Sequence, residues 1–171
     1  RARRHPRLSI AALAAATAIL VLAGLFAHSR WEAARRVATA QRFGQEVERV
    51  ENLTRHAFLL PLHDIRPALE AAQQRLEWIR VEMGRLGGRA LATGHEALGR
   101  GYLALGNAEE ARSHLERAWQ LGERTPQVAS ALGLSLARLY RRALEEAAEI
   151  RNPTLREQQL SVARRDLAEP A

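Results

Sequence analysis

Apolar residues with helical spacing run through most of this 171-residue chain, and they predict an all-α fold. The most apolar stretch covers residues 8–27, which carry no charge and in which only Ser9, Thr17 and Gly24 interrupt the apolar run. A helix of this length spans about 30 Å, which matches the hydrocarbon thickness of a bilayer. The pattern therefore predicts a single-pass transmembrane helix over residues 8–27.

The residues on either side of this segment favour a membrane-spanning helix. Residues 1–7 contain four arginines and form a basic juxtamembrane segment, and Trp31 stands where an interfacial anchor is expected. Because arginine is concentrated before the segment, we expect a cytoplasmic N-terminus and expect the residues after 30 to lie outside the cytoplasm. The chain begins with arginine and not methionine, so we expect it to be part of a longer protein.

Two alternatives to a membrane anchor are open. A cleaved signal peptide also begins with basic residues, but its apolar core is usually about 7 to 15 residues long. In addition, Leu25-Phe26-Ala27 is not a small-x-small cleavage site. A buried core helix is rarely apolar on every face over such a length. The membrane anchor is therefore the favoured interpretation.

Residues 30–88 predict a helical hairpin, because apolar side chains recur there at steps of three and four residues. The first stripe comprises Ala40, Phe43, Val47, Val50 and Ala57. The second comprises Ile65, Leu69, Ala72, Leu76, Ile79, Met83 and Leu86. Pro61 and Pro67 predict a turn between them, and Gly87-Gly88 ends the second helix. The stretches could also form a short parallel coiled coil in a homodimer, but about three heptads are few for that arrangement, so we favour pairing within one chain.

A small-residue signature, Ala97-Leu98-Gly99, recurs 34 positions later as Ala131-Leu132-Gly133. Around the first copy the pattern predicts helices over about 93–105 and 108–121, joined by a turn at Gly106-Asn107. The second copy lacks a turn glycine, so its first helix is expected to continue to about Ile150. Asn152-Pro153 then opens a last helix over 154–167. A period of about 34 residues is typical of tetratricopeptide repeats.

The resemblance to tetratricopeptide repeats covers residues 90–171 and assigns roles to individual side chains. Gly99 and Ala111 are small where two helices approach closely, and Gly133 is the counterpart of Gly99 in the second copy. The turn and the helix seam would be formed by Gly106, Tyr102, Leu115 and Ala118. By the same similarity, the residues that face a binding groove would be Glu96, Arg100, Leu103 and Ala104. Such arrays usually need about three units, so we expect the helices of 31–86 to cap this repeat and further repeats to follow Ala171.

Four segments carry a more specific resemblance: residues 41–47, 59–67, 97–106 and 125–129. Together they resemble the region that follows the catalytic domain in membrane-bound bacterial serine/threonine protein kinases. In that family a cytoplasmic kinase domain precedes one membrane helix and a repeat-containing region. The resemblance implies a non-catalytic sensor region that binds a protein or peptide. The alternatives are a stand-alone anchored scaffold and a purely structural spacer.

The charge distribution does not favour nucleic-acid binding. The net charge is +7, and all 26 basic residues are arginines. Residues 1–36 carry seven arginines and one glutamate, whereas residues 37–171 carry nineteen arginines and eighteen acidic residues, which leaves a net charge of only +1. A phosphate-binding surface would need clustered charge of one sign. We therefore expect no nucleic-acid partner.

Residues that could support catalysis or bind cofactors are missing from the sequence. The chain contains no cysteine, which excludes disulfides, thiolate zinc sites and cysteine nucleophiles. It contains no lysine and no Asp-Phe-Gly, both of which a kinase requires, and Arg165-Asp166-Leu167 only superficially resembles a catalytic loop. His63-Asp64 could bind a metal, but the ligand count of a typical site is not met. We expect no enzymatic activity, cofactor or metal in this segment.

Overall fold

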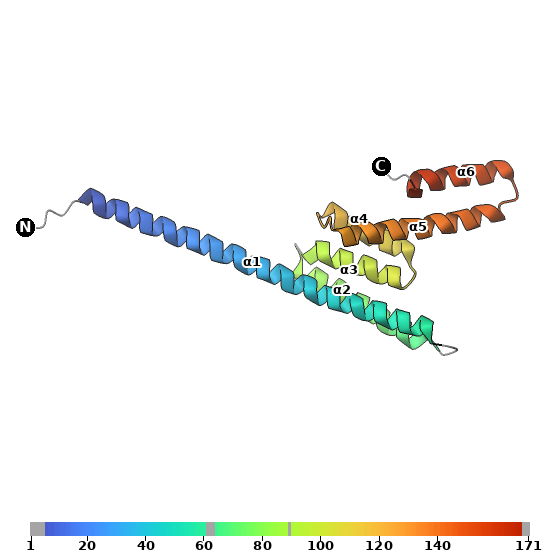
Figure 1. Ribbon diagram of the computed structural model, residues 1–171, viewed down its shortest axis with the longest axis horizontal. Coiled ribbons are helices and arrows are strands. Elements are labelled where there is room, and N and C mark those ends of the chain that lie inside the picture. Colours follow the sequence, from blue (N-terminus) through green and yellow to red (C-terminus); the bar gives the residue numbers. More distant parts are fainter. Residues whose placement is uncertain (1–5, 61–63, 89, 169–171) are drawn as a thin grey trace, which may run out of the picture. The chain divides into compact units, whose positions relative to one another are not determined.

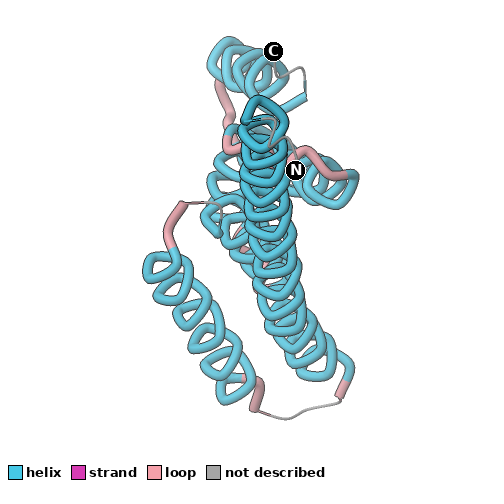
Figure 2. Tube along the Cα trace, turned by 90° about the vertical axis from the view of Figure 1, so that its left-hand side faces the viewer, coloured by secondary structure: helices cyan, strands magenta, loops and turns pink. Residues whose placement is uncertain are grey.

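The computed structural model describes residues 6–60, 64–88 and 90–168. Within these ranges the chain is all-α, as predicted, and contains no strand. The elements are α1 (Pro6–Leu59), α2 (Arg66–Leu86), α3 (Ala90–Ala104), α4 (Ala108–Gln120), α5 (Pro126–Glu149), α6 (Pro153–Ala163) and the short π-helix η1 (Arg164–Ala168). Short loops join most of the helices (Figure 2). The chain divides into two compact units, residues 1–39 and 40–171.

The first unit is the N-terminal part of α1. Between residues 19 and 26 of this helix, large apolar side chains are exposed, including Leu20, Leu22, Leu25 and Phe26. The basic residues at positions 1–5 lie outside the described residues. In the part of the chain that the structure describes, no helix combines the length and hydropathy needed to cross a membrane.

A single helix occupies the positions where the sequence predicts two. The predicted membrane helix over 8–27 and the first helix of the predicted hairpin, which carries the stripe from Ala40 to Ala57, are both parts of α1, which continues through His28, Ser29 and Arg30. These three residues change the polarity of the helix but include neither glycine nor proline, so nothing there interrupts backbone hydrogen bonding. The Ser29 hydroxyl instead donates to the Phe26 carbonyl at 2.8 Å, within the helix. The change in composition therefore does not mark a helix end.

In the second unit, residues 40–59 of α1 pair with α2 as a hairpin (Figure 1). Most of the two predicted apolar stripes are buried in their interface, including Phe43, Val47, Val50, Leu76 and Ile79. The ends differ from the prediction, since Ala40 and Leu86 are exposed. At the start of α2 the Asp64 carboxylate accepts from the Arg66 amide at 3.0 Å, which stabilises the first turn.

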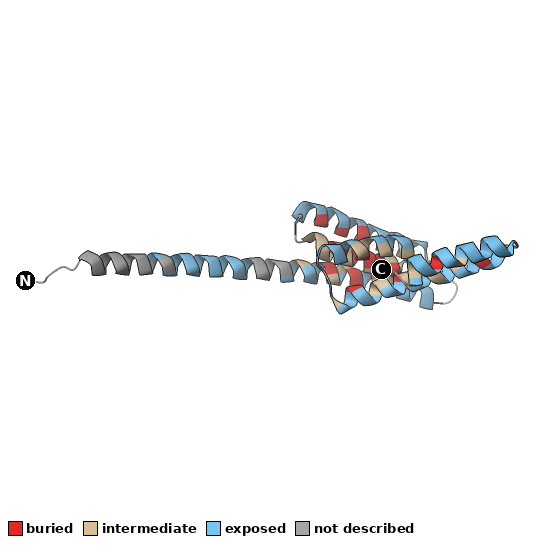
Figure 3. Cartoon of the chain, turned by 90° about the horizontal axis from the view of Figure 1, so that it is seen from above, coloured by how far each residue is buried: buried red, intermediate tan, exposed pale blue. Residues whose placement is uncertain are grey.

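The α3/α4 and α5/α6 hairpins continue the stack. Helix α3 belongs to two hydrophobic clusters, because Leu98 packs with α1 and α2 whereas Leu103 packs with α4 and α5. Ala147 of α5 and Ala163 of α6 are buried at the last pair. Buried residues accordingly lie on the sides of these helices that face other helices (Figure 3). The described residues between 40 and 168 therefore form three successive helical hairpins, and α3 joins the two hydrophobic clusters.

Glycines allow α3 to approach its neighbours closely. A methyl group added to Gly94 would lie 2.6 Å from the Met83 side chain of α2, and one added to Gly101 would overlap Leu76 of the same helix. At the end of α3, Gly106 has φ +81° and provides the predicted turn. Asn107 then caps α4, because its side-chain oxygen accepts from the Glu110 amide at 3.1 Å.

Candidate functional site

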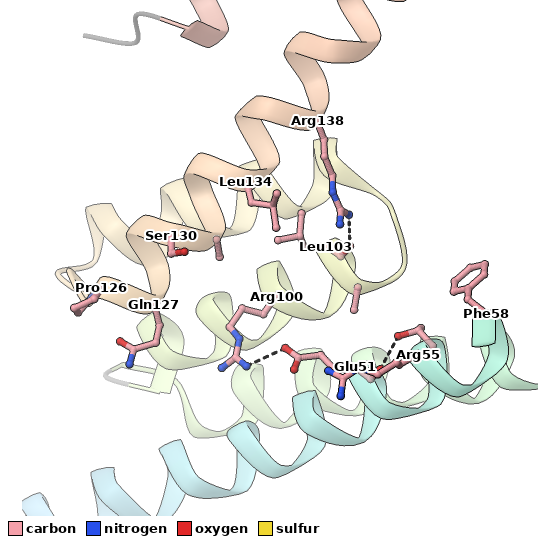
Figure 4. A pocket seen from close by; sticks show the side chains of 13 residues that line it. Glu51, Arg55, Phe58, Arg100, Leu103, Pro126, Gln127, Ser130, Leu134 and Arg138 are labelled. Carbon is pink, nitrogen blue, oxygen red and sulfur yellow. Dashed lines mark hydrogen bonds and ion pairs between the residues drawn. The ribbon is translucent and has the colours of Figure 1, made fainter. Parts of the chain in front are cut away.

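An open groove of about 740 Å³ lies on one side of the second unit (Figure 4). Its walls come from α1, α3 and α5, which are the first helices of the three successive hairpins. The lining residues are Glu51, Thr54, Arg55, Phe58, Arg100, Leu103, Ala104, Pro126, Gln127, Ser130, Ala131, Leu134 and Arg138. On each helix the contributing positions include residues three and four apart, which share a helix face, so each helix contributes one face. A surface that repeats from hairpin to hairpin is suited to an extended segment.

Helix α3 forms the middle of the groove. Three of the four predicted groove residues, Arg100, Leu103 and Ala104, line it. Leu103 is only 8% exposed, so it belongs to the floor and also to the core beneath. The Arg100 guanidinium binds the Glu51 carboxylate of α1 at 2.9 Å, which ties two walls together.

The prediction for Glu96 is wrong, because this residue does not line the groove. Glu96 is partly buried one turn before Arg100, and burial raises the pKa of its carboxyl. The carboxylate of Glu123, in the loop before α5, raises that pKa further. Of these two residues, only Arg100 lines the open groove.

Helix α1 supplies the wall that the sequence prediction missed. Thr54 is buried, and its hydroxyl donates a hydrogen bond to the Val50 carbonyl of the same helix at 2.9 Å. The hydroxyl therefore does not need a partner from a ligand. Arg55 is exposed, and its guanidinium has no hydrogen bond or ion pair with any of the described residues. Phe58 leaves 64% of its surface accessible at the end of the groove. This wall therefore offers one cation and one aromatic ring.

Helix α5 forms the third wall, and the 34-residue period could have identified it. Leu134 lies 34 residues after Arg100, and Arg138 lies 34 residues after Ala104. Leu134 is 48% exposed, although it is a large apolar side chain. The Arg138 guanidinium donates to the Leu103 carbonyl at 2.7 Å, across to α3. The α1 wall has no comparable signal, because no repeated signature relates residues 51–58 to α3.

The residues expected to pack the repeat occupy the α3/α4 interface. Ala111, Leu115 and Ala118 are fully buried there, and a methyl group added to Gly99 would lie 2.5 Å from Leu115 Cγ. Gly133 differs from the prediction: it is exposed, and no atom lies within 4 Å of the position of an added methyl group. The repeated Ala-Leu-Gly signature therefore marks a close contact in its first copy only.

A polar cluster links α2, α3 and α4 through Tyr102. The Tyr102 ring stacks on His114, with ring centroids 5.5 Å apart, and its hydroxyl accepts from Arg80. His114 Nδ1 lies 2.8 Å from His95 Nδ1, so one neutral ring donates to the other. Burial lowers the pKa of both histidines. The charges of Arg117 and Arg80 lower the pKa of His95 and His114 respectively, whereas Glu110 partly opposes the change at His114.

The histidine pair predicts a loss of stability in acid. Because the folded pKa of each ring lies below its unfolded value, the unfolded chain binds more protons as the pH falls below about 6.5. The free energy of unfolding should therefore be constant above that pH and decrease below it, until the folded pKa values are passed. Urea unfolding of the wild type and of His114→Gln at pH 7.5 and 5.5 measures this, and the variant should lose less stability between the two. Equal losses would contradict the prediction.

The described residues contain no group of three His, Asp or Glu side chains that could hold a metal ion. Residue 63 of the His63-Asp64 doublet lies outside the described residues, and the nearby His56 ring is hydrogen-bonded to the Asn52 carbonyl of its own helix at 2.9 Å. Comparisons with protein-family models, curated proteins and solved structures find no match for this chain. A functional interpretation therefore has to rest on the groove and on the sequence.

Proposed function

We propose that this chain is a non-catalytic region that binds an extended protein or peptide segment in the groove of its stacked hairpins. The observation that carries the proposal is the groove itself, which three equivalent helices line with regularly spaced side chains. Phe58 and Leu134 are large apolar side chains exposed along it, and such residues are favourable contacts for a peptide. The tetratricopeptide-like period agrees with this use, because repeat proteins bind partners along such surfaces.

The proposal also includes a membrane anchor and a parent kinase. The apolar run at residues 8–27 with its basic flank supports single-pass anchoring, with the groove outside the cytoplasm. The resemblance of four segments to membrane-bound bacterial serine/threonine kinases supports a sensor role. Binding of a ligand would then change the spacing or dimerisation of the membrane helices by favouring one of two arrangements.

A stand-alone anchored scaffold is the alternative from a different class. The two proposals differ in what precedes Arg1. A kinase catalytic domain encoded directly upstream supports the receptor kinase, whereas a start codon close to Arg1 supports the scaffold. The topology has its own test: a protease added to intact cells should cleave residues after 30, and cleavage only after lysis would contradict the extracytoplasmic placement.

Peptide binding in the groove predicts a specific pair of mutational results. The full chain in mild detergent selects binders from a random library of displayed peptides, and fluorescence anisotropy then measures their affinity. Leu134→Gln, which removes an apolar contact from the groove, should weaken binding about fivefold to tenfold. Leu155→Gln serves as the matched control, because Leu155 is a 54% exposed leucine on α6 outside the groove.

Two outcomes would contradict the proposed groove. If the library yields no binders, the hairpins act as a structural spacer. If binders appear but Leu134→Gln and Leu155→Gln have equal effects, the peptide binds elsewhere on the molecule.

A further inference from the structure

We infer, building on the proposed function, that the groove accepts an acidic segment whose carboxylates pair with its arginines while apolar side chains cover Phe58 and Leu134. Charge complementarity carries this inference. The charged residues that line the groove are three arginines and one glutamate: Arg55, Arg100, Arg138 and Glu51. The excess of two positive charges is local, because residues 37–171 as a whole carry only +1. The groove is thus more basic than the rest of the unit that forms it.

The three guanidiniums differ in how much of their charge is already neutralised. Arg55 is exposed and pairs with no carboxylate among the described residues. Arg138 donates to the Leu103 carbonyl, which is a neutral acceptor and leaves its positive charge uncompensated. Each guanidinium has five N–H donors, so Arg138 keeps donors for a ligand. These two arginines come from opposite walls, α1 and α5, and could contact the same segment from both sides.

Arg100 stands between them and is held by a carboxylate of the chain itself. Its distance to Glu51 is 2.9 Å, and both side chains keep about 30% of their surface accessible, 31% and 29% respectively. A carboxylate of the ligand would have to replace Glu51 at Arg100, or approach the pair against the negative charge of Glu51. Glu51 is therefore an internal competitor for acidic ligands, and its removal should strengthen their binding.

The apolar surface between the arginines argues for a peptide and against a nucleic acid. Leu103 and Ala104 form the middle of the groove, and Leu134 lies beside them (Figure 4). Phe58 is the one aromatic side chain in the lining, whereas single-stranded nucleic acids usually stack on several aromatic rings along a basic track. An extended peptide with alternating acidic and apolar residues matches both features.

A pair of matched peptides tests the inference on the full chain in mild detergent. One labelled peptide repeats the sequence Asp-Leu-Glu-Leu three times, and the other repeats Asn-Leu-Gln-Leu, which keeps the shape and removes the charge. The acidic peptide should bind about tenfold more tightly at 50 mM salt, and the difference should shrink at 500 mM salt as screening increases. A single-stranded oligonucleotide of similar charge should not displace it.

Three variants connect the charge effect to the groove. Arg55→Glu should lower the affinity for the acidic peptide about fivefold to tenfold and leave the affinity for the amide peptide unchanged. The effect is modest because an exposed ion pair contributes little, and the charge reversal adds repulsion to the loss of that pair. Arg141→Glu is the matched control: it makes the same change in net charge on α5, outside the groove. Glu51→Gln should strengthen binding of the acidic peptide and not of the amide peptide. Far-ultraviolet circular dichroism checks that each variant is folded.

The outcomes separate this inference from the proposed function. If both peptides bind equally, or if Arg55→Glu and Arg141→Glu act alike, the charge inference is wrong although a peptide groove is retained. If the oligonucleotide displaces the peptide, the ligand class is wrong. If neither these peptides nor any library peptide binds, both proposals fail.

Discussion

Gly99→Ala should lower the free energy of unfolding by about 1–2 kcal/mol, whereas Gly133→Ala should raise it by up to about 1 kcal/mol. The two glycines end the same Ala-Leu-Gly signature, but their surroundings differ. A methyl group at Gly99 would lie 2.5 Å from Leu115 Cγ and 3.2 Å from the Ala111 carbonyl oxygen, so a branch point and a backbone atom would have to move. At Gly133 nothing lies within 4 Å, so alanine gains helix propensity without a clash.

Urea unfolding followed by circular dichroism measures both changes. Each variant replaces a helical glycine that follows Ala-Leu with alanine, so the two variants differ mainly in the surroundings of the added methyl group. Similar effects of the two variants, of either sign, would contradict the close α3/α4 contact.

Leu115→Ala should destabilise the protein by about 2–5 kcal/mol, because Leu115 is completely buried between α3, α4 and α5. The same substitution removes the two Leu115 atoms closest to an added methyl group at Gly99 and leaves only the 3.2 Å approach to the Ala111 carbonyl oxygen. In the double variant, Gly99→Ala should therefore cost much less, because the methyl group also fills part of the cavity. We expect a coupling free energy of about 1–2 kcal/mol between the two positions.

A double-mutant cycle of urea unfolding curves tests this coupling. Ile79→Ala provides the control, because Ile79 of α2 is equally buried but packs in the cluster shared with α1, and it is not among the neighbours of an added methyl group at Gly99. Its effect should add to that of Gly99→Ala within about 0.5 kcal/mol. Additive effects for both Leu115→Ala and Ile79→Ala would show that Gly99 does not contact Leu115.

The helix boundaries of the second unit could be predicted from the sequence because they depend on local chemistry. Thr125-Pro126 and Asn152-Pro153 open α5 and α6, where Thr125 accepts from the Val128 amide at 3.2 Å and Asn152 from the Thr154 amide at 3.0 Å. Gly87 ends α2, and Gly106 allows the α3/α4 turn. Each of these residues restricts the backbone or satisfies a free amide wherever the helix later packs.

Contacts between helices could not be predicted in the same way. Gly99 and Gly133 end the same Ala-Leu-Gly tripeptide, yet only Gly99 faces a helix closely, because that depends on how α4 lies against α3. Glu96 lies one turn before Arg100 but does not line the groove. The α1 wall was not predicted for a related reason. Periodicity in the sequence shows which face of a helix is apolar, but it does not show which other helix packs beside that face.

Charged and apolar side chains both line the α1 and α5 walls of the groove. Arg55 and Phe58 on α1, and Leu134 and Arg138 on α5, are all exposed although none is required by the core. Together with Arg100 they form a surface that is both basic and apolar.

Site-specific cross-linking tests the central claim, that a peptide binds between the first helices of the three hairpins. The chain contains no cysteine, so Ser130→Cys in the groove and Ser113→Cys on α4 each introduce one site for a benzophenone maleimide. Both serines are exposed, and only Ser130 lines the groove. Our account predicts that a bound acidic peptide is cross-linked from position 130 and not from position 113. Equal cross-linking from both positions, or cross-linking from position 113 alone, would contradict it.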